Sequence, residues 1–316
     1  REALKGRAMT APTGTFLTTA AIGNREDLTD IIYRISPTQT PVLNMSAKAK
    51  ATNTLHEWQT QDLAAVATSP FNAQVEGDVA GAGTTVPVGK TITPTVRLTN
   101  RTQISAKTAI VSGTQQAMNQ AGRKDEMAYQ MSLISLEVKR DMEAGLTQSD
   151  VLATAPRQSR GLRGWVVDNV NRNGGTLASY TANTGYTVGT LRSFTESQVK
   201  DVLQQVYTAG GEPDTIMLPP ALKQTFSGFT GNATRMDKSE DAKLYSSVDF
   251  YVSDFGTLQC VPNRFMATRD VFVLESSKLA VAYLRPFMTV ELAKLGDSMQ
   301  QQLIVEYTLE CRAPKA

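Results

Sequence analysis

Residues 67–92 constrain the fold of this sequence most. The segment contains four glycines and two prolines, and its only charged residues are Glu76, Asp78 and Lys90. A structureless segment this long is uncommon inside a compact domain and usually has a function of its own. With many glycines, few charges and no helical period, it cannot bury enough surface by itself to offset the entropy lost on ordering. The segment therefore predicts a contact with a neighbouring subunit rather than a place in the subunit core.

Alternating segments flank this loop on both sides. From Thr54 to Asp62, and again from Thr91 to Ile104, apolar and polar residues alternate as in a β-strand. An isolated hairpin is marginally stable in water, so the arm that spans 53–108 should lie on other protein. Trp58 is the expected anchor because its side chain is large and amphipathic. The predicted intersubunit contacts are Trp58, Phe71, Val75, Val86, Val88 and Lys90.

A long helix follows the arm, from Arg123 to Leu146. Its apolar residues recur at steps of four, three, four and four, which is one face of an α-helix. At 1.5 Å per residue such a helix is about 35 Å long. We interpret its methionines as packing residues that fill irregular gaps in a core. The residues expected to face the core are Met127, Met131, Ile134, Val138 and Met142.

Shorter elements precede and follow this helix. Asn24 is a candidate N-cap for a helix with an apolar face through Ile35, after which residues 41–43 should be extended. The glycines of 161–168 predict a turn into a strand. Thr195 and Gln198 form a candidate capping box for a helix that ends at Gly210. Short strands are expected at 215–218, 248–252, 258–261, 271–274, 279–283, 288–292 and 302–309. Together these elements indicate an α+β chain.

The sequence offers little for catalysis. His56 is the only histidine, which excludes His-rich metal sites, and neither GxGxxG nor GxxxxGK[ST] occurs. The two cysteines are too few for a disulfide framework and are interpreted as reduced thiols. No apolar run is long enough to predict a membrane span. We therefore predict no catalytic, cofactor-binding or metal-binding residues, no enzyme activity and no membrane partner.

The charge balance also restricts the function. The net charge is +2, from 32 Lys and Arg against 30 Asp and Glu, which argues against a protein whose main task is to coat nucleic acid. Two local basic pairs, Lys48 with Lys50 and Arg123 with Lys124, are candidates for weak, sequence-blind phosphate contact. Solvated surface positions are an equal alternative for both pairs.

Several stretches resemble the major capsid proteins of tailed bacteriophages. The resemblance covers nearly the whole chain and rests on structural motifs and their order. The stretches are residues 25–43 (REDLTDIIYRISPTQTPVL), 54–63 (TLHEWQTQDL), 160–165 (RGLRGW), 292–298 (LAKLGDS) and 304–312 (IVEYTLECR).

The resemblance implies the Hong Kong 97-type fold. It divides the chain into an N-terminal arm at 1–52, an extended loop at 53–108, a peripheral domain at 109–193 with its spine helix at 123–146, an axial domain at 194–284, and strands at 285–316 that return to the peripheral sheet. Some members of this group crosslink a loop lysine to an asparagine of a neighbour. Lys90 is the only lysine within 67–92, but no acceptor can be identified, so we do not predict crosslinking.

The resemblance also implies a function and partners. The expected role is a structural major capsid protein of the virion that assembles in the host bacterial cytoplasm. Its hexamers and pentamers would form an icosahedral shell around double-stranded DNA. From the two basic pairs we expect any contact with this DNA at Lys48, Lys50, Arg123 and Lys124, on the inner surface. A portal and a scaffolding protein are expected partners, and a decoration protein is a partner in some members. No scaffolding segment is visible in the sequence, which suggests a separate scaffold or prior processing.

Two alternatives stay open at this point. An encapsulin-type shell has the same fold and holds a cargo protein, but the long arm before Asn24 argues against it. Packaged protein in place of DNA would favour that alternative. An enzyme with an unrecognised site is the other, and a monomer with measurable turnover would favour it.

Overall fold

The computed structural model of the protein describes residues 35–63, 66, 76, 93–118, 120, 122–229 and 250–315. The helix expected from Asn24 lies outside these residues except for Ile35, which is exposed and not helical. Most of the loop at 67–92 also lies outside them. The helices are α1 (Pro41–Met45), α2 (Gly113–Ala117), α3 (Glu126–Gln148), α4 (Leu162–Trp165), α5 (Glu196–Ala209) and α6 (Pro220–Ser227), with a 3₁₀ turn at Ser276–Lys278.

Two four-stranded sheets organise the chain, one with the order β1-β11-β12-β4 and the other β10-β7-β9-β8. Two smaller hairpins, β2-β3 and β5-β6, complete the strands. The strands are β1 (Ala47–Lys50), β2 (Leu55–Thr60), β3 (Val96–Arg101), β4 (Gln103–Ser112), β5 (Ala153–Thr154), β6 (Arg157–Gln158), β7 (Thr215–Leu218), β8 (Phe250–Ser253), β9 (Gly256–Pro262), β10 (Phe272–Leu274), β11 (Leu279–Glu291) and β12 (Ser298–Cys311).

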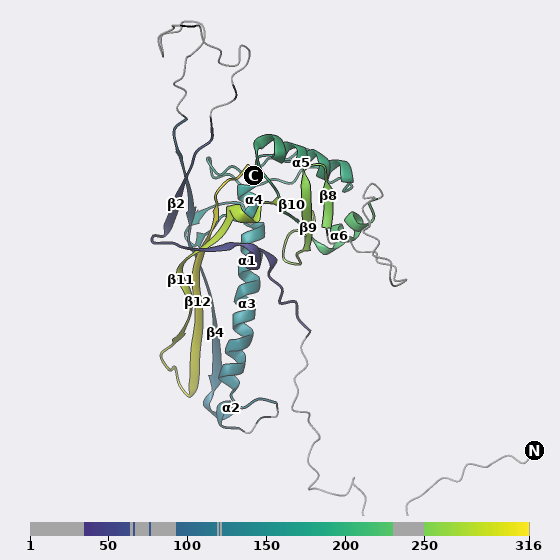
Figure 1. Ribbon diagram of the computed structural model, residues 1–316. Coiled ribbons are helices and arrows are strands. Elements are labelled where there is room, and N and C mark those ends of the chain that lie inside the picture. Colours follow the sequence, from purple (N-terminus) through teal and green to yellow (C-terminus); the bar gives the residue numbers. More distant parts are fainter. Residues whose placement is uncertain are drawn as a thin grey trace, which may run out of the picture.

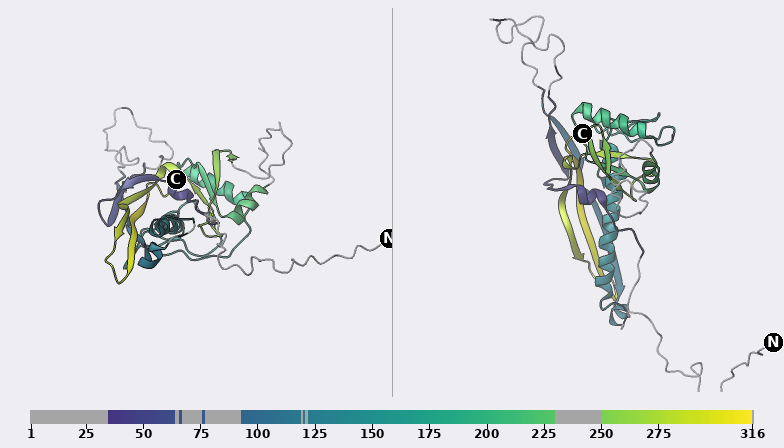
Figure 2. Two further views of the ribbon diagram at one scale, coloured as in Figure 1. Left: turned by 90° about the horizontal axis from the view of Figure 1, so that it is seen from below. Right: turned by 45° about the vertical axis from the view of Figure 1, so that its right-hand side comes forward.

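The larger core lies between α3 and the first sheet (Figures 1 and 2). Asp125 begins the helix, because its side chain accepts a hydrogen bond from the amide of Ala128. Alternate residues of β12, including Val305, Tyr307 and Leu309, face α3 and are buried. The residues of α3 that the sequence assigned to packing lie on this side: Met127, Ile134, Val138 and Met142 are buried, and Met131 packs at the core edge.

The strand β11 differs from the sequence prediction. Two separate strands were expected at 279–283 and 288–292, but one strand runs from Leu279 to Glu291 and pairs with β12 over its length. A bulge around Pro286, where Arg285 pairs with Glu306 and Met288 with Ile304, interrupts the alternation and explains the difference. The predicted boundary between the axial domain (194–284) and the returning strands (285–316) therefore falls inside β11.

The second sheet forms its own core with α5 and α6. Val199, Leu203 and Val206 of α5 pack against Ile216, Leu218 and other residues of that sheet. Gly210 ends α5 in the left-handed conformation, with φ of 90°. The predicted capping box does not form at its start, because the side chain of Thr195 makes no capping hydrogen bond. The backbone amide of Gln198 instead donates a hydrogen bond of 3.2 Å to the carbonyl oxygen of Thr195.

Two local predictions were wrong. Residues 41–43 are the start of α1 and not extended, since Pro41 occupies the first helical position, where its missing N–H costs nothing. The chain after Gly161 forms the short helix α4 and no strand, because Gly161 lies against the end of α3. A Cβ there would lie 2.5 Å from the carbonyl oxygen of Leu146.

Candidate assembly surface

The face of the first sheet that points away from α3 is open to solvent over part of its length (Figure 2). The register places Ala106 beside Ile304, and Ile304 beside Met288. Ile104 of β4 lies next to this row on the same face, and Ile110, which is 64% exposed, lies further along β4, beyond Thr108. We call this set, Ile104, Ala106, Ile110, Met288 and Ile304, the outer face. Exposed apolar side chains gathered on one sheet face indicate a surface that another protein covers.

An ionic cluster closes one end of the outer face. Glu306 of β12, paired with Ile104, is 3% exposed and accepts hydrogen bonds from Arg157 Nη2 at 2.7 Å and Arg285 Nε at 2.8 Å. Thr102 Oγ1 donates a further bond of 2.8 Å. Burial raises the pKa of Glu306, but the bonds from Thr102 and Arg285 and the positive charges outweigh it and lower the pKa below its ordinary value. The Glu306 carboxylate thus orients two arginines at this end.

The arm β2-β3 is fastened to the body at its base. Trp58 Nε1 donates to the carbonyl oxygen of Cys311 at 3.0 Å, and its ring lies 5.2 Å from that of Trp165. His56 Nε2 lies 3.1 Å from the carboxylate of Glu310, so the histidine is partly buried in an ion-pair position. The buried Asn100 donates to the carbonyl oxygens of Arg160 and Leu309. Trp58 therefore packs within its own subunit, and its expected contact with a neighbour remains a prediction.

Beyond this base the arm leaves the body. β2 and β3 pair from Leu55 opposite Arg101 to Thr60 opposite Val96. Both views that show the arm place it beyond one end of the first sheet (Figures 1 and 2). Of the predicted loop contacts, Phe71, Val75, Val86, Val88 and Lys90 lie outside the described residues, and Glu76 is an exposed turn residue.

A buried carboxylate joins three parts of the fold. Glu143 of α3 accepts hydrogen bonds from the amides of Val42 at 2.8 Å and Leu43 at 3.1 Å, and from Asn263 Nδ2 at 2.7 Å. Burial raises the pKa of Glu143, and these three neutral donors lower it by less. These hydrogen bonds hold α1 and the loop after β9 against α3.

The four predicted DNA contacts do not form one patch. Lys48 and Lys50 are exposed on one face of β1, beside Val281 and Tyr283 of β11. Arg123 lies beyond the opposite end of the sheet, where it forms an ion pair with Glu126 and stacks over Tyr129. Lys124 is exposed next to it. Opposite ends of β12 are about 40 Å apart at the usual strand rise of about 3.3 Å per residue, so the two pairs are independent.

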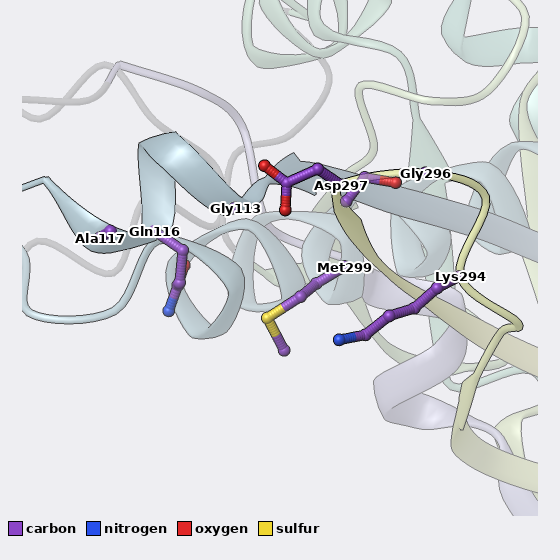
Figure 3. Close-up of a pocket in the computed structure, with 8 residues that line it drawn as sticks. Gly113, Gln116, Ala117, Lys294, Gly296, Asp297 and Met299 are labelled. Carbon is purple, nitrogen blue, oxygen red and sulfur yellow. The ribbon is translucent and has the colours of Figure 1, made fainter.

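An open groove lies at the tip of the sheet, between α2 and the turn that joins β11 to β12 (Figure 3). It has a volume of about 340 Å³ and is lined by Gln116, Lys294, Asp297, Met299 and neighbours. Figure 3 shows polar and apolar side chains mixed along it, among them Gln116, Lys294 and Met299. Such a shallow, mixed surface differs from the concave, largely apolar pockets that bind small molecules.

No other chemistry emerges from the described residues. They contain no group of three His, Cys, Asp or Glu side chains that could hold a metal ion. No helix among them is long and apolar enough to cross a bilayer. Cys260 and Cys311 are both buried, and burial raises the pKa of the Cys311 thiol to about 12, which keeps it protonated and unreactive.

Known proteins with similar sequences identify the family of this chain. The sequence model of the SU10 major capsid protein family matches residues 11–316. The chain belongs to the SU10 major capsid protein family. The major capsid protein of Escherichia phage Phieco32 is 30% identical, and the match covers 93% of this chain and 93% of that protein.

Solved capsid structures share the fold of this capsid protein. The cyanophage A-1(L) capsid asymmetric unit superposes with a TM-score of 0.62 at 15% identity, covering 93% of this chain and 94% of that one. The capsid of the native GTA particle gives 0.63 at 9% identity, with 95% of each chain covered. The mixed α+β fold is therefore of the Hong Kong 97 type, as the resemblance implied.

The family defines the role of the capsid protein. It is a structural protein of a phage capsid shell, found in the virion, and the shell is built from many copies of it. The encapsulin-type alternative is not favoured by these matches. The family implies a structural, non-enzymatic role. No signal in the local sequence pointed to Glu306, Arg157 or Arg285, because their contact joins residues 149 and 21 positions apart.

Proposed function

We propose that the capsid protein assembles as hexamers and pentamers into an icosahedral shell that encloses double-stranded DNA, and that the loop at 67–92 is the joint between neighbouring subunits. It acts in the host bacterial cytoplasm, where a portal and a scaffolding protein support assembly. It carries no catalytic activity of its own. Portal, scaffold and any decoration protein are partners that family membership suggests.

One observation carries the proposal. The arm β2-β3 is fastened at its base through Trp58, His56 and Asn100, yet it projects away from the body (Figure 1). Residues 67–92, which connect its two strands, contain few charged residues and four glycines. A rigid base that presents such a segment away from its own core suits a contact on another subunit. The exposed outer face supplies apolar surface for such a contact.

Shortening the loop tests the proposal. We would replace residues 67–92 by a short Gly-Ser turn between the strand ends at Thr60 and Val96. The subunit should keep cooperative thermal unfolding, because the core lies in α3 and the two large sheets. Shells, seen by negative-stain microscopy with scaffold present, should fail to form or should fall apart on dilution.

Two results would count against the joint. Loss of cooperative unfolding in the shortened subunit would place the loop in the core. Normal, stable shells from it would make the loop dispensable. A matched control replaces the exposed turn between β11 and β12 (residues 293–296) by a Gly-Ser turn of the same length, which should leave the arm contact intact.

A further inference from the structure

Two arginines at the end of the outer face share a single carboxylate. Arg157 and Arg285 both bind Glu306, so the cluster carries a net charge of +1, from two positive groups and one negative. In the described part of the chain, neither arginine has another acidic partner within 4 Å. Arg285 is 44% exposed and Arg157 26%. Each guanidinium has five N–H donors, and Glu306 engages only part of this capacity.

The cluster borders apolar surface on the same face. Glu306 pairs with Ile104 in β4 and with Arg285 in β11, and the next row places Ile304 beside Met288. Ile104 and Met288 are 45% and 42% exposed. An incoming segment with a carboxylate flanked by apolar side chains would therefore find both a cationic and an apolar partner at this place.

The loop at 67–92 has this composition. Its charged residues, Glu76, Asp78 and Lys90, give −2 + 1 = −1. Apolar residues stand before the two acids, at Phe71 and Val75, and after them, at Val86 and Val88. The segment 1–34 instead has five Lys or Arg and four Asp or Glu, a net charge of +1. Charge complementarity with the cluster thus favours the loop over the N-terminal segment.

The described strands of the arm lead away from the cluster, toward the ends that residues 67–92 connect. Thr102, whose hydroxyl contacts Glu306, follows β3 directly, whereas the loop joins β3 at its other end, before Val96. The six residues of β3 separate these two ends by about 20 Å. Figures 1 and 2 show the arm pointing away from the first sheet. A loop from another copy can approach without reversing its path.

We propose that Arg157 and Arg285 of one subunit bind Glu76 and Asp78 in the loop of a neighbouring subunit, while Ile104, Met288 and Ile304 contact the apolar residues beside them. This rests on the proposed function, in which the loop joins neighbours. Glu306 holds both guanidiniums in place before the neighbour arrives, so little side-chain entropy is lost on binding. Arginine suits the task because its planar fork binds carboxylates with two parallel hydrogen bonds.

Carbodiimide crosslinking tests the pairing directly. The variants Arg157→Lys and Arg285→Lys keep the charge and supply a primary amine that couples to a carboxylate in contact. Shells would be assembled from equal amounts of nitrogen-15-labelled and unlabelled subunits, and mass spectrometry would identify the joined peptides. We expect mixed-isotope products between position 157 or 285 and Glu76 or Asp78. Products with Glu306 report that the introduced amine is reactive.

Other products would overturn the assignment. Coupling to Glu26, Asp27 or Asp30 would give the site to the N-terminal segment. Products within one subunit only, or with Glu306 alone, would leave the cluster without an intersubunit partner.

Neutralising the loop acids gives a second test. Glu76→Gln with Asp78→Asn should raise the critical concentration for shell formation several-fold, and about 1 M NaCl should produce a similar rise in the unaltered protein. The matched control is Glu57→Gln on the same arm, where the carboxylate pairs with Arg97 of its own subunit. An unchanged critical concentration in the loop variant would refute the pairing. If shortening the loop nevertheless abolished shells, the loop would still be the contact between subunits. Only its binding to Arg157 and Arg285 would then be refuted.

Discussion

Two buried glutamates, Glu143 and Glu306, accept hydrogen bonds from different kinds of donor. Glu143 is held by neutral amide donors, and burial leaves its pKa raised. Glu306 is held by Thr102, Arg285 and Arg157, and its pKa is lowered although burial opposes this. The difference is the presence of positive charge, which favours the ionised form of a carboxyl group. Glu306 therefore contributes electrostatic stability, whereas Glu143 positions the chain at some electrostatic cost.

The stability of the subunit should fall in acid partly through Glu306. Its folded pKa lies below the ordinary value of 4.5, so its ionised form stabilises the fold above about pH 4.5. That contribution is lost as the pH falls through the folded pKa. We expect Glu306→Gln to lower the free energy of unfolding near pH 7 by roughly 2–3 kcal/mol and to flatten the acid limb. Denaturant melts across pH would measure both effects.

The control for this prediction is Glu137→Gln. Glu137 pairs with Lys107 on the exposed side of α3, so its loss should change stability by less than about 1 kcal/mol. An acid limb of unchanged steepness in Glu306→Gln would show that other carboxylates govern the acid transition.

At the scale of elements, α3 connects the parts of the fold. It packs on the first sheet, it receives α1 through Glu143, and its last turn meets Gly161 and the loop after β9 through Thr147 and Gln148. Substitutions on its buried face should therefore affect the whole subunit, and those on its exposed face should not.

Ile134→Asp should destabilise the subunit severely. Ile134 is buried against the sheet, and a carboxylate there has no positive partner, which costs several kcal/mol. Thermal unfolding would measure the loss, and expression should yield little soluble protein. Ser132→Asp, on the exposed side of the same turn, is the matched control and should remain stable. Soluble, assembly-competent Ile134→Asp protein would place the packing face elsewhere.

Two glycines near the end of α3 should respond differently to alanine. A Cβ at Gly161 would lie 2.5–2.8 Å from backbone atoms of residues 145 and 146, so Gly161→Ala must push α4 away from α3. A Cβ at Gly145 would meet only the hydroxyl of Tyr307 at 3.4 Å, and alanine favours the helix by about 1 kcal/mol. We expect a melting temperature several degrees lower for Gly161→Ala and an unchanged or higher one for Gly145→Ala. The reverse order would disprove the close packing of α4 on α3.

At the scale of the whole molecule, the residues that stabilise the subunit differ from the surfaces that can bind neighbouring subunits. The two cores hold the subunit together, and the arm and the outer face are available to neighbours. The basic pairs lie at separate ends, and Arg123 is already paired with Glu126. With a net charge of +2, the shell should tolerate DNA rather than hold it tightly.

Any DNA contact should therefore be sequence-blind and salt-sensitive. Replacing Lys48 and Lys50 by Gln should reduce the slope of log affinity against log salt by about 2, or about 0.9 for each lost phosphate contact. Arg123→Gln should change it little, because Glu126 already neutralises that charge. Filter binding over a salt series would measure the slopes, with exposed Lys139→Gln as the control. Tight, sequence-selective and salt-independent retention would contradict this.

Local periodicity predicted the elements that depend on near neighbours in the chain. The steps between Met127 and Met142 placed α3, the alternation around Trp58 placed β2, and Gly210 marked the end of α5 because only glycine adopts that backbone conformation easily. The order of the segments was enough to imply the fold family, since the motifs are spread over nearly the whole chain.

Only the tertiary structure decided which distant residues bind each other within the subunit. Trp58 finds its hydrogen-bond acceptor in Cys311, 253 residues away, and Glu306 gathers Arg157 across 149 residues. Pro41 starts a helix because Glu143, about 100 residues later, accepts the amides of the two residues that follow it. A short-range pattern carries no information on which distant residue arrives. Folding selects these partners because a buried polar group without one costs more free energy than the contact itself contributes.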